Sequence, residues 1–316
     1  MNRPVISVLL PVYNGMEYLR TTVESVQRQS FPDWEILLCD DVSKDGSLAL
    51  CHDLAAADPR LRVFANRENL RIPGNINKLS LEARGDYLCI LSQDDVLEPE
   101  YFSVLIESAR RTGADLTMCD FIEIDDKGVR RSTTHHAPWR DFIFRGAEKI
   151  FQPAELLDEI YRRSSLPFSI TSLIRADRFR TAGGYHTDYP YICDSNFHLD
   201  LLLEGGNVCF VNRPLFQYRR HDQMTTLREG RSRMAEEHHY VLARHMPRIA
   251  PLLPTGKWNT AFRVFRRAWK RLITSTLCRA YPTRAYWRDL LKASAATVLG
   301  RRFAPGRGSL TTGNQP

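Results

Sequence analysis

The first 125 residues alternate between short apolar runs and segments with a helical period. Five runs rich in branched and aromatic residues predict strands buried on both faces, at 5–12, 34–41, 62–66, 86–92 and 114–124. Apolar residues spaced three and four apart predict helices between them, at 18–26, 45–57, 74–83 and 99–111. Strands and helices that alternate at these lengths predict an α/β fold, with a mainly parallel sheet flanked by helices on both faces.

The alternation stops after residue 125. The tetrapeptide DDKG (125–128) predicts a hairpin turn, and residues 131–152 are polar and irregular. Helical and strand-like segments then mix up to VCFVNRPLFQYRRH (208–221). We therefore expect a second part of the fold to begin near residue 126.

Two pairs of adjacent acids follow predicted strands. Asp40 and Asp41 end the second strand, and Asp94 and Asp95 end the fourth. The carboxyl ends of parallel strands form one ligand-binding edge, so both pairs are expected there. Crowded carboxylates are unfavourable unless a positive group lies among them. Helix capping and exposed loop acids remain the alternative explanation for either pair.

Glycine-rich phosphate loops are missing from the sequence. No GxGxxG follows the first predicted strand, and no GxxxxGK[ST] motif occurs. These absences argue against a nicotinamide-dependent dehydrogenase and against a P-loop NTPase. A site built of carboxylates instead predicts a hard divalent cation, Mg²⁺ or Mn²⁺, which takes few protein carboxylates and completes its coordination with phosphate oxygens.

Composition and cysteine usage are those of a globular protein of the cytoplasm. The chain is 43% hydrophobic and 26% charged. Its seven cysteines are scattered, without CxxC or zinc-ligand spacing, which indicates reduced thiols. The sequence shows no signal peptide and no run of about 18 apolar residues, so no membrane-spanning helix is expected.

Four segments together resemble the family 2 glycosyltransferases. They are VISVLLPVYNGMEYLRTTVESVQRQSFPDWEILLCDDVSKDGS (5–47), NLRIPGNINKLSLEARGDYLCILSQDDVLEPEYF (69–102), GGYHTDYPYICDSNFHLDLLLEGG (183–206) and VNRPLFQYRRH (211–221). They occur in the family's order and spacing, and the resemblance covers about residues 4–222. It implies a GT-A type α/β fold and an inverting transfer of a sugar from a nucleotide sugar, expected to be a UDP-sugar, to an acceptor hydroxyl.

The resemblance also implies roles for residues around the donor. Pro11, Tyr13 and Asp41 would flank the nucleotide base, and Asp94 would face the ribose. Asp95 would hold Mg²⁺ or Mn²⁺ on the diphosphate.

Two further roles fall on the later segments. Asp194 would be the general base, and Cys193 replaces the acid that usually precedes it in the family. His221, which closes QYRRH, would contact the metal or the diphosphate. Asp188 and Asp200 remain alternative bases.

The sequence departs from the family pattern at three donor-side positions. Ser92 replaces the first acid of the DxDD motif, which matters little if Asp95 is the metal ligand. Arg71 replaces a usual glycine and Ile76 a usual arginine, which alters the diphosphate contacts of this segment. Arg67 or Arg71 would substitute for them.

Four other residues have two interpretations each. Arg219 and Arg220 are neighbours on a predicted strand and point to opposite faces, so only one of them can turn toward phosphate groups. Tyr185 and Tyr191 line either an acceptor pocket or the core.

Positive charge is concentrated at the end of the chain. Residues 247–316 hold 14 Lys and Arg and one acid, a net charge of +13, whereas residues 1–246 carry −6. Large apolar residues recur there at helical spacing between basic ones: Trp258, Phe262, Phe265, Trp269, Leu272 and Ile273. This pattern favours helices that bind an anionic membrane surface. Packing on the catalytic domain is the alternative, and nucleic acid is not an expected partner.

These observations predict two regions and one function. A GT-A catalytic domain would span 1–225, with a nucleotide-sugar half at about 1–125 and an acceptor half at about 126–225. A basic helical region with a disordered end would span 226–316. The acceptor would be a saccharide or lipid-linked saccharide of cell-surface polysaccharide or glycolipid synthesis, reached at the inner face of the plasma membrane. The alternative is a non-catalytic protein that binds nucleotide sugars or polyanions on a decayed transferase domain. Asp41, Asp95 and Asp194 together favour the enzyme.

Overall fold

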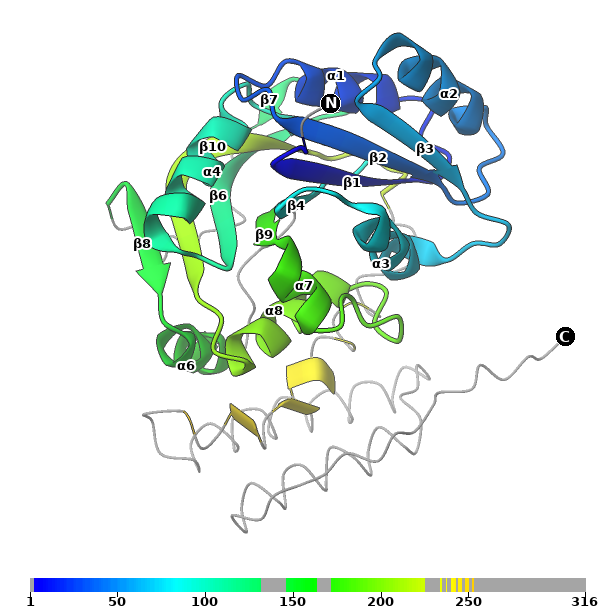
Figure 1. Ribbon diagram of the computed structural model, residues 1–316. Helices are drawn as coiled ribbons and strands as arrows, with labels where there is room; N and C mark the ends of the chain where they lie inside the picture. The colour runs from blue at the N-terminus through cyan, green and yellow to red at the C-terminus, as the bar shows by residue number, and fades with distance from the viewer. Residues whose placement is uncertain are drawn as a thin grey trace, which may run out of the picture.

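A computed structural model describes residues 3–131, 146–163 and 172–224, together with single residues between 234 and 252. Within these ranges the chain forms a ten-stranded sheet (Figure 1). Its strands are β1 (Ile6–Val12), β2 (Trp34–Asp40), β3 (Leu61–Ala65), β4 (Tyr87–Ile90), β5 (Val96–Leu97), β6 (Leu116–Ile124), β7 (Arg130–Arg131), β8 (Glu148–Phe151), β9 (Ser172–Arg175) and β10 (Val208–Arg219).

Six of the ten described strands run in the same direction, which agrees with the predicted mainly parallel sheet, and the other four are antiparallel to their neighbours. Eight strands follow the order β3-β2-β1-β4-β9-β6-β10-β5, and the five predicted strands correspond to β1, β2, β3, β4 and β6. β1 runs parallel to its neighbours β2 and β4, and β6 runs parallel to β10. The prediction missed β9, which lies between β4 and β6 and is antiparallel to both. Its four residues, SLIR, are too few to show a period.

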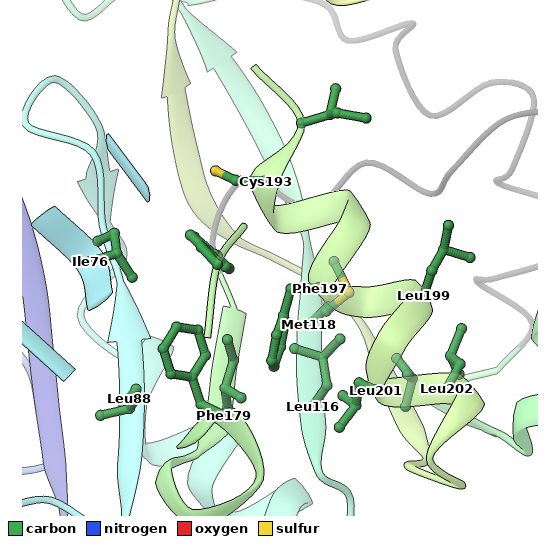
Figure 2. Close-up of a cluster of buried hydrophobic side chains, with 14 of the residues drawn as sticks. Ile76, Leu88, Leu116, Met118, Phe179, Cys193, Phe197, Leu199, Leu201 and Leu202 are labelled. Atoms are coloured by element: carbon green, nitrogen blue, oxygen red, sulfur yellow. The ribbon is translucent and has the colours of Figure 1, made fainter. Parts of the chain in front are cut away.

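Helices cover both faces of the sheet, as the alternation predicts (Figure 1). They are α1 (Leu19–Gln27), α2 (Ser47–Ala57), α3 (Arg71–Glu82), α4 (Tyr101–Thr112), α6 (Pro153–Arg163), α7 (Ala176–Thr181) and α8 (Cys193–Leu203). The alternation of side chains along β1 separates two cores. Val8 and Leu10 belong to the core that includes α1, α2 and α4, whereas Leu9 belongs to the core that includes α3, α6, α7 and α8. Figure 2 shows part of the second core, with Ile76 of α3 and Phe197 of α8 on either side of Phe179 of α7.

The hairpin predicted at DDKG is present. Gly128 donates its peptide N–H to the carbonyl of Asp125 at 3.0 Å, with a φ of +80° that favours glycine. β7 then pairs antiparallel with β6. The turn therefore ends the alternation of strands and helices near residue 125.

The basic tail lies largely outside the described residues. Residues 253–316 are not described. They include Trp258, Phe262, Phe265, Trp269 and Cys278. Val241, Leu242 and Ile249 lie in the second core with α6 and α8. The division into domains at residue 225 stays a prediction.

Candidate active site

Both acid pairs lie at one edge of the sheet, as predicted. β1 lies between β2 and β4 and runs parallel to both, so the loops that follow these three strands open at the same edge. Asp40 and Asp41 belong to the end of β2 and the loop after it, and Asp94 and Asp95 to the loop after β4. Tyr13, in the loop after β1, lies between them in strand order and is 47% exposed.

Asp94 faces His221 across this edge. Its Oδ2 lies 2.8 Å from Nε2 of the imidazole. β10 runs parallel to β6 and ends at Arg219, so His221, two residues later, lies at the same edge. The ring of Tyr18 packs beside the imidazole, with the ring centroids 4.9 Å apart. Nδ1 of His221 is buried and has no hydrogen-bond partner in the described part of the chain.

Asp95 points into the protein instead. It is 1% exposed, and its Oδ1 accepts the peptide N–H of Arg219 at 2.9 Å. Burial and the neighbouring Asp94 carboxylate raise the pKa of Asp95 well above its ordinary value, and its contacts with Arg219 offset only part of this rise. The other oxygen of Asp95, Oδ2, is buried and has no hydrogen-bond partner in the described part of the chain, so it is available to bind a cation. The metal role of Asp95 stays a prediction, and Asp94 is a second candidate at this edge.

The pair of Asp94 and His221 suits a divalent cation. Carboxylate oxygen and imidazole nitrogen are both ligands of ions such as Mn²⁺. No group of three or more His, Cys, Asp or Glu side chains among the described residues is placed to hold an ion. Two protein ligands leave positions for diphosphate oxygens and water, which is how Mg²⁺ is usually held in nucleotide sites. The donor set therefore fits a metal that a nucleotide brings with it.

Asp41 organises the loop before α3. Its Oδ1 accepts hydrogen bonds from Asn66 Nδ2 and from the peptide N–H of Leu70, both at 2.8 Å. Its Oδ2 accepts the peptide N–H of Arg71 at 3.0 Å. A carboxylate has about four acceptor positions, so these three bonds leave room for one more donor. Asp41 is thus a structural residue that could still accept a hydrogen bond from a base.

The departures from the family pattern have structural explanations. Arg71 has a φ of +57°, so it keeps the left-handed conformation that favours the usual glycine. Its side chain and that of Arg67 are exposed beside the loop after β2. Ile76 is fully buried in the second core and cannot replace an arginine. Pro11 lies half-buried within β1, opposite Cys39 of β2.

Asp194 lies on a different element from the acid pairs. It is half-buried in the first turn of α8, and its Oδ1 accepts the peptide N–H of Ser195 at 2.6 Å. The segment leading to it is attached to α3 by Asn77, whose side-chain amide exchanges two hydrogen bonds of 2.7 Å with the backbone of Tyr185. Cys193 marks the beginning of α8 in Figure 2. The role of Asp194 stays a prediction.

The two alternative bases differ in their surroundings. Asp188 is exposed. Asp200 contacts His186 at 3.3 Å, His245 at 3.0 Å and Arg248 at 3.2 Å. Although burial raises the pKa of Asp200, its hydrogen bonds to the two histidines lower it well below the ordinary value. A carboxylate held in this way is a weak base, so Asp200 is a poor alternative to Asp194.

Both arginines of QYRRH are held by contacts within the protein. Arg219 is 4% exposed and donates from Nε to the carbonyl of Asp94 at 2.8 Å. Arg220 lies 3.8 Å from the carboxylate of Glu123. Tyr185 is buried against Phe179, which agrees with its interpretation as a core residue.

Sequence reasoning missed two side-chain amides. Asn77 joins α3 to the segment before α8, and Gln93, between Ser92 and Asp94, holds the backbone of Tyr13. Each contact joins segments that are 80 or more residues apart, and no local pattern marks them. Among the helices of the described residues, none combines the length and the apolar character needed to cross a bilayer.

The chain is similar in sequence to bacterial glycosyltransferases. EpsH of Bacillus subtilis (strain 168) is 26% identical over 230 residues, which are 70% of this chain and 62% of EpsH. Glycosyltransferase GlyG of Streptococcus pneumoniae serotype 4 (strain ATCC BAA-334 / TIGR4) is 25% identical over 227 residues, 68% of this chain and 71% of GlyG. The chain thus spans less than two thirds of the length of EpsH.

Two solved structures share the fold. S. aureus TarS 1-349 in complex with UDP-GlcNAc has a TM-score of 0.64 at 16% identity, covering 93% of this chain and 81% of that one. Mannosyltransferase PcManGT from Pyrobaculum calidifontis, in complex with GDP-Man and Mn²⁺, has a TM-score of 0.54 at 15% identity, covering 95% and 88%. The fold expected from the sequence, an α/β GT-A type, is confirmed. The family model of glycosyl transferase family 2 matches residues 7–172, just over half of the chain, and the protein therefore belongs to the family 2 glycosyltransferases.

Proposed function

We propose that this chain transfers a sugar from a UDP-sugar to a saccharide hydroxyl in the synthesis of a cell-surface polysaccharide or glycolipid. The observation that carries the proposal is the contact of 2.8 Å between Asp94 and His221 at the carboxyl edge of a parallel sheet. Family membership supports transfer chemistry, and the fold shared with TarS bound to UDP-GlcNAc supports uridine as the base.

The donor would lie along the edge formed by the loops after β1, β2 and β4. Tyr13, Pro11 and Asp41 would surround the base, with the remaining acceptor position of Asp41 available to a base N–H. Arg67 and Arg71 are exposed at the two ends of the loop before α3, which Asp41 holds, and they would meet the diphosphate.

His221 and Asp94 would hold Mg²⁺ or Mn²⁺ together with the unpartnered Oδ2 of Asp95. When bound, the ion supplies positive charge that stabilises the leaving diphosphate. The fold shared with a mannosyltransferase structure that contains Mn²⁺ is consistent with this assignment.

Asp194 would remove the proton of the acceptor hydroxyl as that oxygen attacks the anomeric carbon. It is half-buried in the first turn of α8, whereas Asp200 is held by His186 and His245. One base and one displacement invert the anomeric centre, so we propose an inverting reaction.

Release of UDP from a panel of nucleotide sugars, with and without Mn²⁺, tests the proposal and separates it from binding without catalysis. We expect turnover of a UDP-sugar that needs the ion and increases with a saccharide acceptor. A folded protein that binds UDP but turns over none of the panel, with any acceptor, would favour the non-catalytic alternative. A folded protein that binds no nucleoside diphosphate would refute the proposed donor site.

We also propose that the basic segment 247–316 holds the enzyme at an anionic membrane, where a lipid-linked acceptor would be found. The proposal rests on the charge of +13 and the helical spacing of large apolar residues. The chain should co-sediment with anionic liposomes, and changing Trp258, Phe262, Phe265 and Trp269 together to Ser should release it. Absence of binding at low salt would exclude the membrane role.

A further inference from the structure

The loop after β1 is held in place by side chains of two other segments. Tyr13 donates its peptide N–H to Gln93 Oε1 at 2.8 Å, and Asn14 donates to Ser43 Oγ at 3.0 Å. The next two peptide N–H groups complete the series: Gly15 donates to Ser47 Oγ at 2.8 Å and Met16 to Asp45 Oδ2 at 3.1 Å. Four successive N–H groups are satisfied in this way, so hydrogen bonds within the protein define the conformation of the loop.

Gln93 makes the most specific of these contacts. Besides accepting from Tyr13 N–H, it donates from Nε2 to the carbonyl of Tyr13 at 3.0 Å. One side-chain amide thus satisfies both backbone groups of a single residue, as a neighbouring strand would. The backbone of Gln93 is itself fixed, because Thr22 Oγ1 in α1 lies 2.9 Å from the carbonyl of Gln93 and 2.8 Å from that of Asp95.

Gly15 leaves the room that this contact needs. A Cβ atom on Gly15 would lie 2.8 Å from Cδ of Gln93 and even closer to its Oε1, a separation that real Cβ atoms do not adopt. The φ of Gly15 is not in the left-handed region, so its need for glycine comes from this close approach. Gly15 and Gln93 therefore act as one unit.

This unit lies between the two ends of the proposed donor site. The side chain of Gln93 reaches back to Tyr13, and that of the next residue, Asp94, faces His221. Tyr13 keeps a fixed backbone while its side chain is 47% exposed at the edge of the sheet. An aromatic ring on a fixed backbone loses less conformational freedom when a flat ligand stacks on it.

We propose that Gln93 is a positioning residue that fixes Tyr13 for stacking against the nucleoside base of the donor. The inference rests on the proposed donor site and adds a residue that touches neither the base nor the ion. Gln93 acts on the base end of the nucleotide through Tyr13, not on the metal end through Asp94.

A double-mutant cycle tests the inference on the full chain, with UDP as the probe. The variants are Gln93→Ala, Gly15→Ala and the double variant, and Gln27→Ala is the control. Gln27 is also a half-buried glutamine with one side-chain hydrogen bond, 3.0 Å to Asp58, at the far end of α1. Calorimetry gives the Kd for UDP with and without Mn²⁺, and steady-state kinetics give KM and kcat for the donor.

We expect each single variant to weaken UDP binding about tenfold, because the one or two hydrogen bonds that hold the backbone of Tyr13 are lost. The factor should be the same with and without Mn²⁺. Donor KM should rise while kcat stays within about twofold, because the contact is the same in ground and transition states. The double variant should be no weaker than Gln93→Ala, since Gly15→Ala does harm only by displacing the Gln93 amide.

Three results would overturn the inference in a wild-type chain that binds UDP. The first is a Gln93→Ala variant that binds UDP as tightly as Gln27→Ala. The second is a loss of UDP affinity that is seen only with Mn²⁺. The third is a double variant whose loss of UDP affinity is the sum of the two single losses. Failure of the wild type to bind UDP would instead refute the donor site itself, which keeps the two ideas apart.

Discussion

Arg219 offers the sharpest test of how the site is supported. It donates from Nε to the carbonyl of Asp94 at 2.8 Å, and from Nη1 to the carbonyls of Asp125 and Asp126 at 3.2 Å each. Its guanidinium also lies over the ring of Tyr18, 4.6 Å from the centroid. The side chain thus connects the acidic loop to the hairpin between β6 and β7.

Arg219→Met keeps much of the apolar stem and removes these contacts. A hydrogen bond from a charged group contributes about 1.5–3 kcal/mol, and the charge also regains hydration on unfolding, which offsets part of the sum. We therefore expect a loss of about 2–4 kcal/mol in the free energy of unfolding, because the carbonyls of Asp94, Asp125 and Asp126 lose this donor. That is a large fraction of the about 5–15 kcal/mol typical of a folded domain.

The neighbouring residue provides the control. The side chain of Arg220 is 28% exposed and lies 3.8 Å from Glu123, so Arg220→Met should cost less than about 1 kcal/mol. Urea unfolding, followed by tryptophan fluorescence, measures both variants. If Arg219→Met does not fold, Arg219→Lys, which keeps the charge but not the planar fork, should give an intermediate loss. Equal losses at positions 219 and 220 would refute the reasoning, because only position 219 is buried in this network.

Three other outcomes can be measured directly. Asp94→Asn should abolish the gain in UDP affinity that Mn²⁺ produces and leave the affinity without metal unchanged; the same loss in both conditions, by calorimetry, would contradict a metal role. Asp194→Asn should lower kcat by about 10²–10⁴ with nearly unchanged donor affinity, and near-normal turnover would mean that the base is another residue. Hydrogen bonds from Arg60 outweigh burial and lower the pKa of Asp58 to about 2, so this carboxylate stabilises the fold above its unfolded pKa and loses that effect as the pH falls toward 2. Asp58→Asn should therefore cost about 1 kcal/mol at pH 7, allowing for solvent screening, and its difference from wild type in urea unfolding should shrink between pH 5 and pH 3; a constant difference would contradict the linkage.

Local pattern was enough to predict the parallel half of the fold. Strands buried on both faces are continuous apolar runs, and helices that cover them are amphipathic, so burial is recorded in short stretches of sequence. The topology of an open parallel sheet then places Asp40, Asp41, Asp94 and Asp95 at one edge. Both the edge and its acidic residues therefore follow from short stretches of sequence and the general rules of sheet topology.

The short antiparallel strand β9 could not be predicted in the same way. Its place between β4 and β6 depends on partners more than 50 residues away in sequence. Periodicity records whether a residue is buried, but not which strand buries it. The second half of the catalytic fold is therefore decided by long-range pairing.

The roles within the acid pair also depended on tertiary structure. Asp94 and Asp95 are chemically identical neighbours, and the sequence alone assigned the metal to Asp95. The end of β10, more than 120 residues later, gives Asp95 a backbone N–H from Arg219 and gives Asp94 the imidazole of His221. Which carboxyl is buried and which faces His221 is set by the register of that distant strand, and register is a property of the packed sheet, not of either acid's own segment.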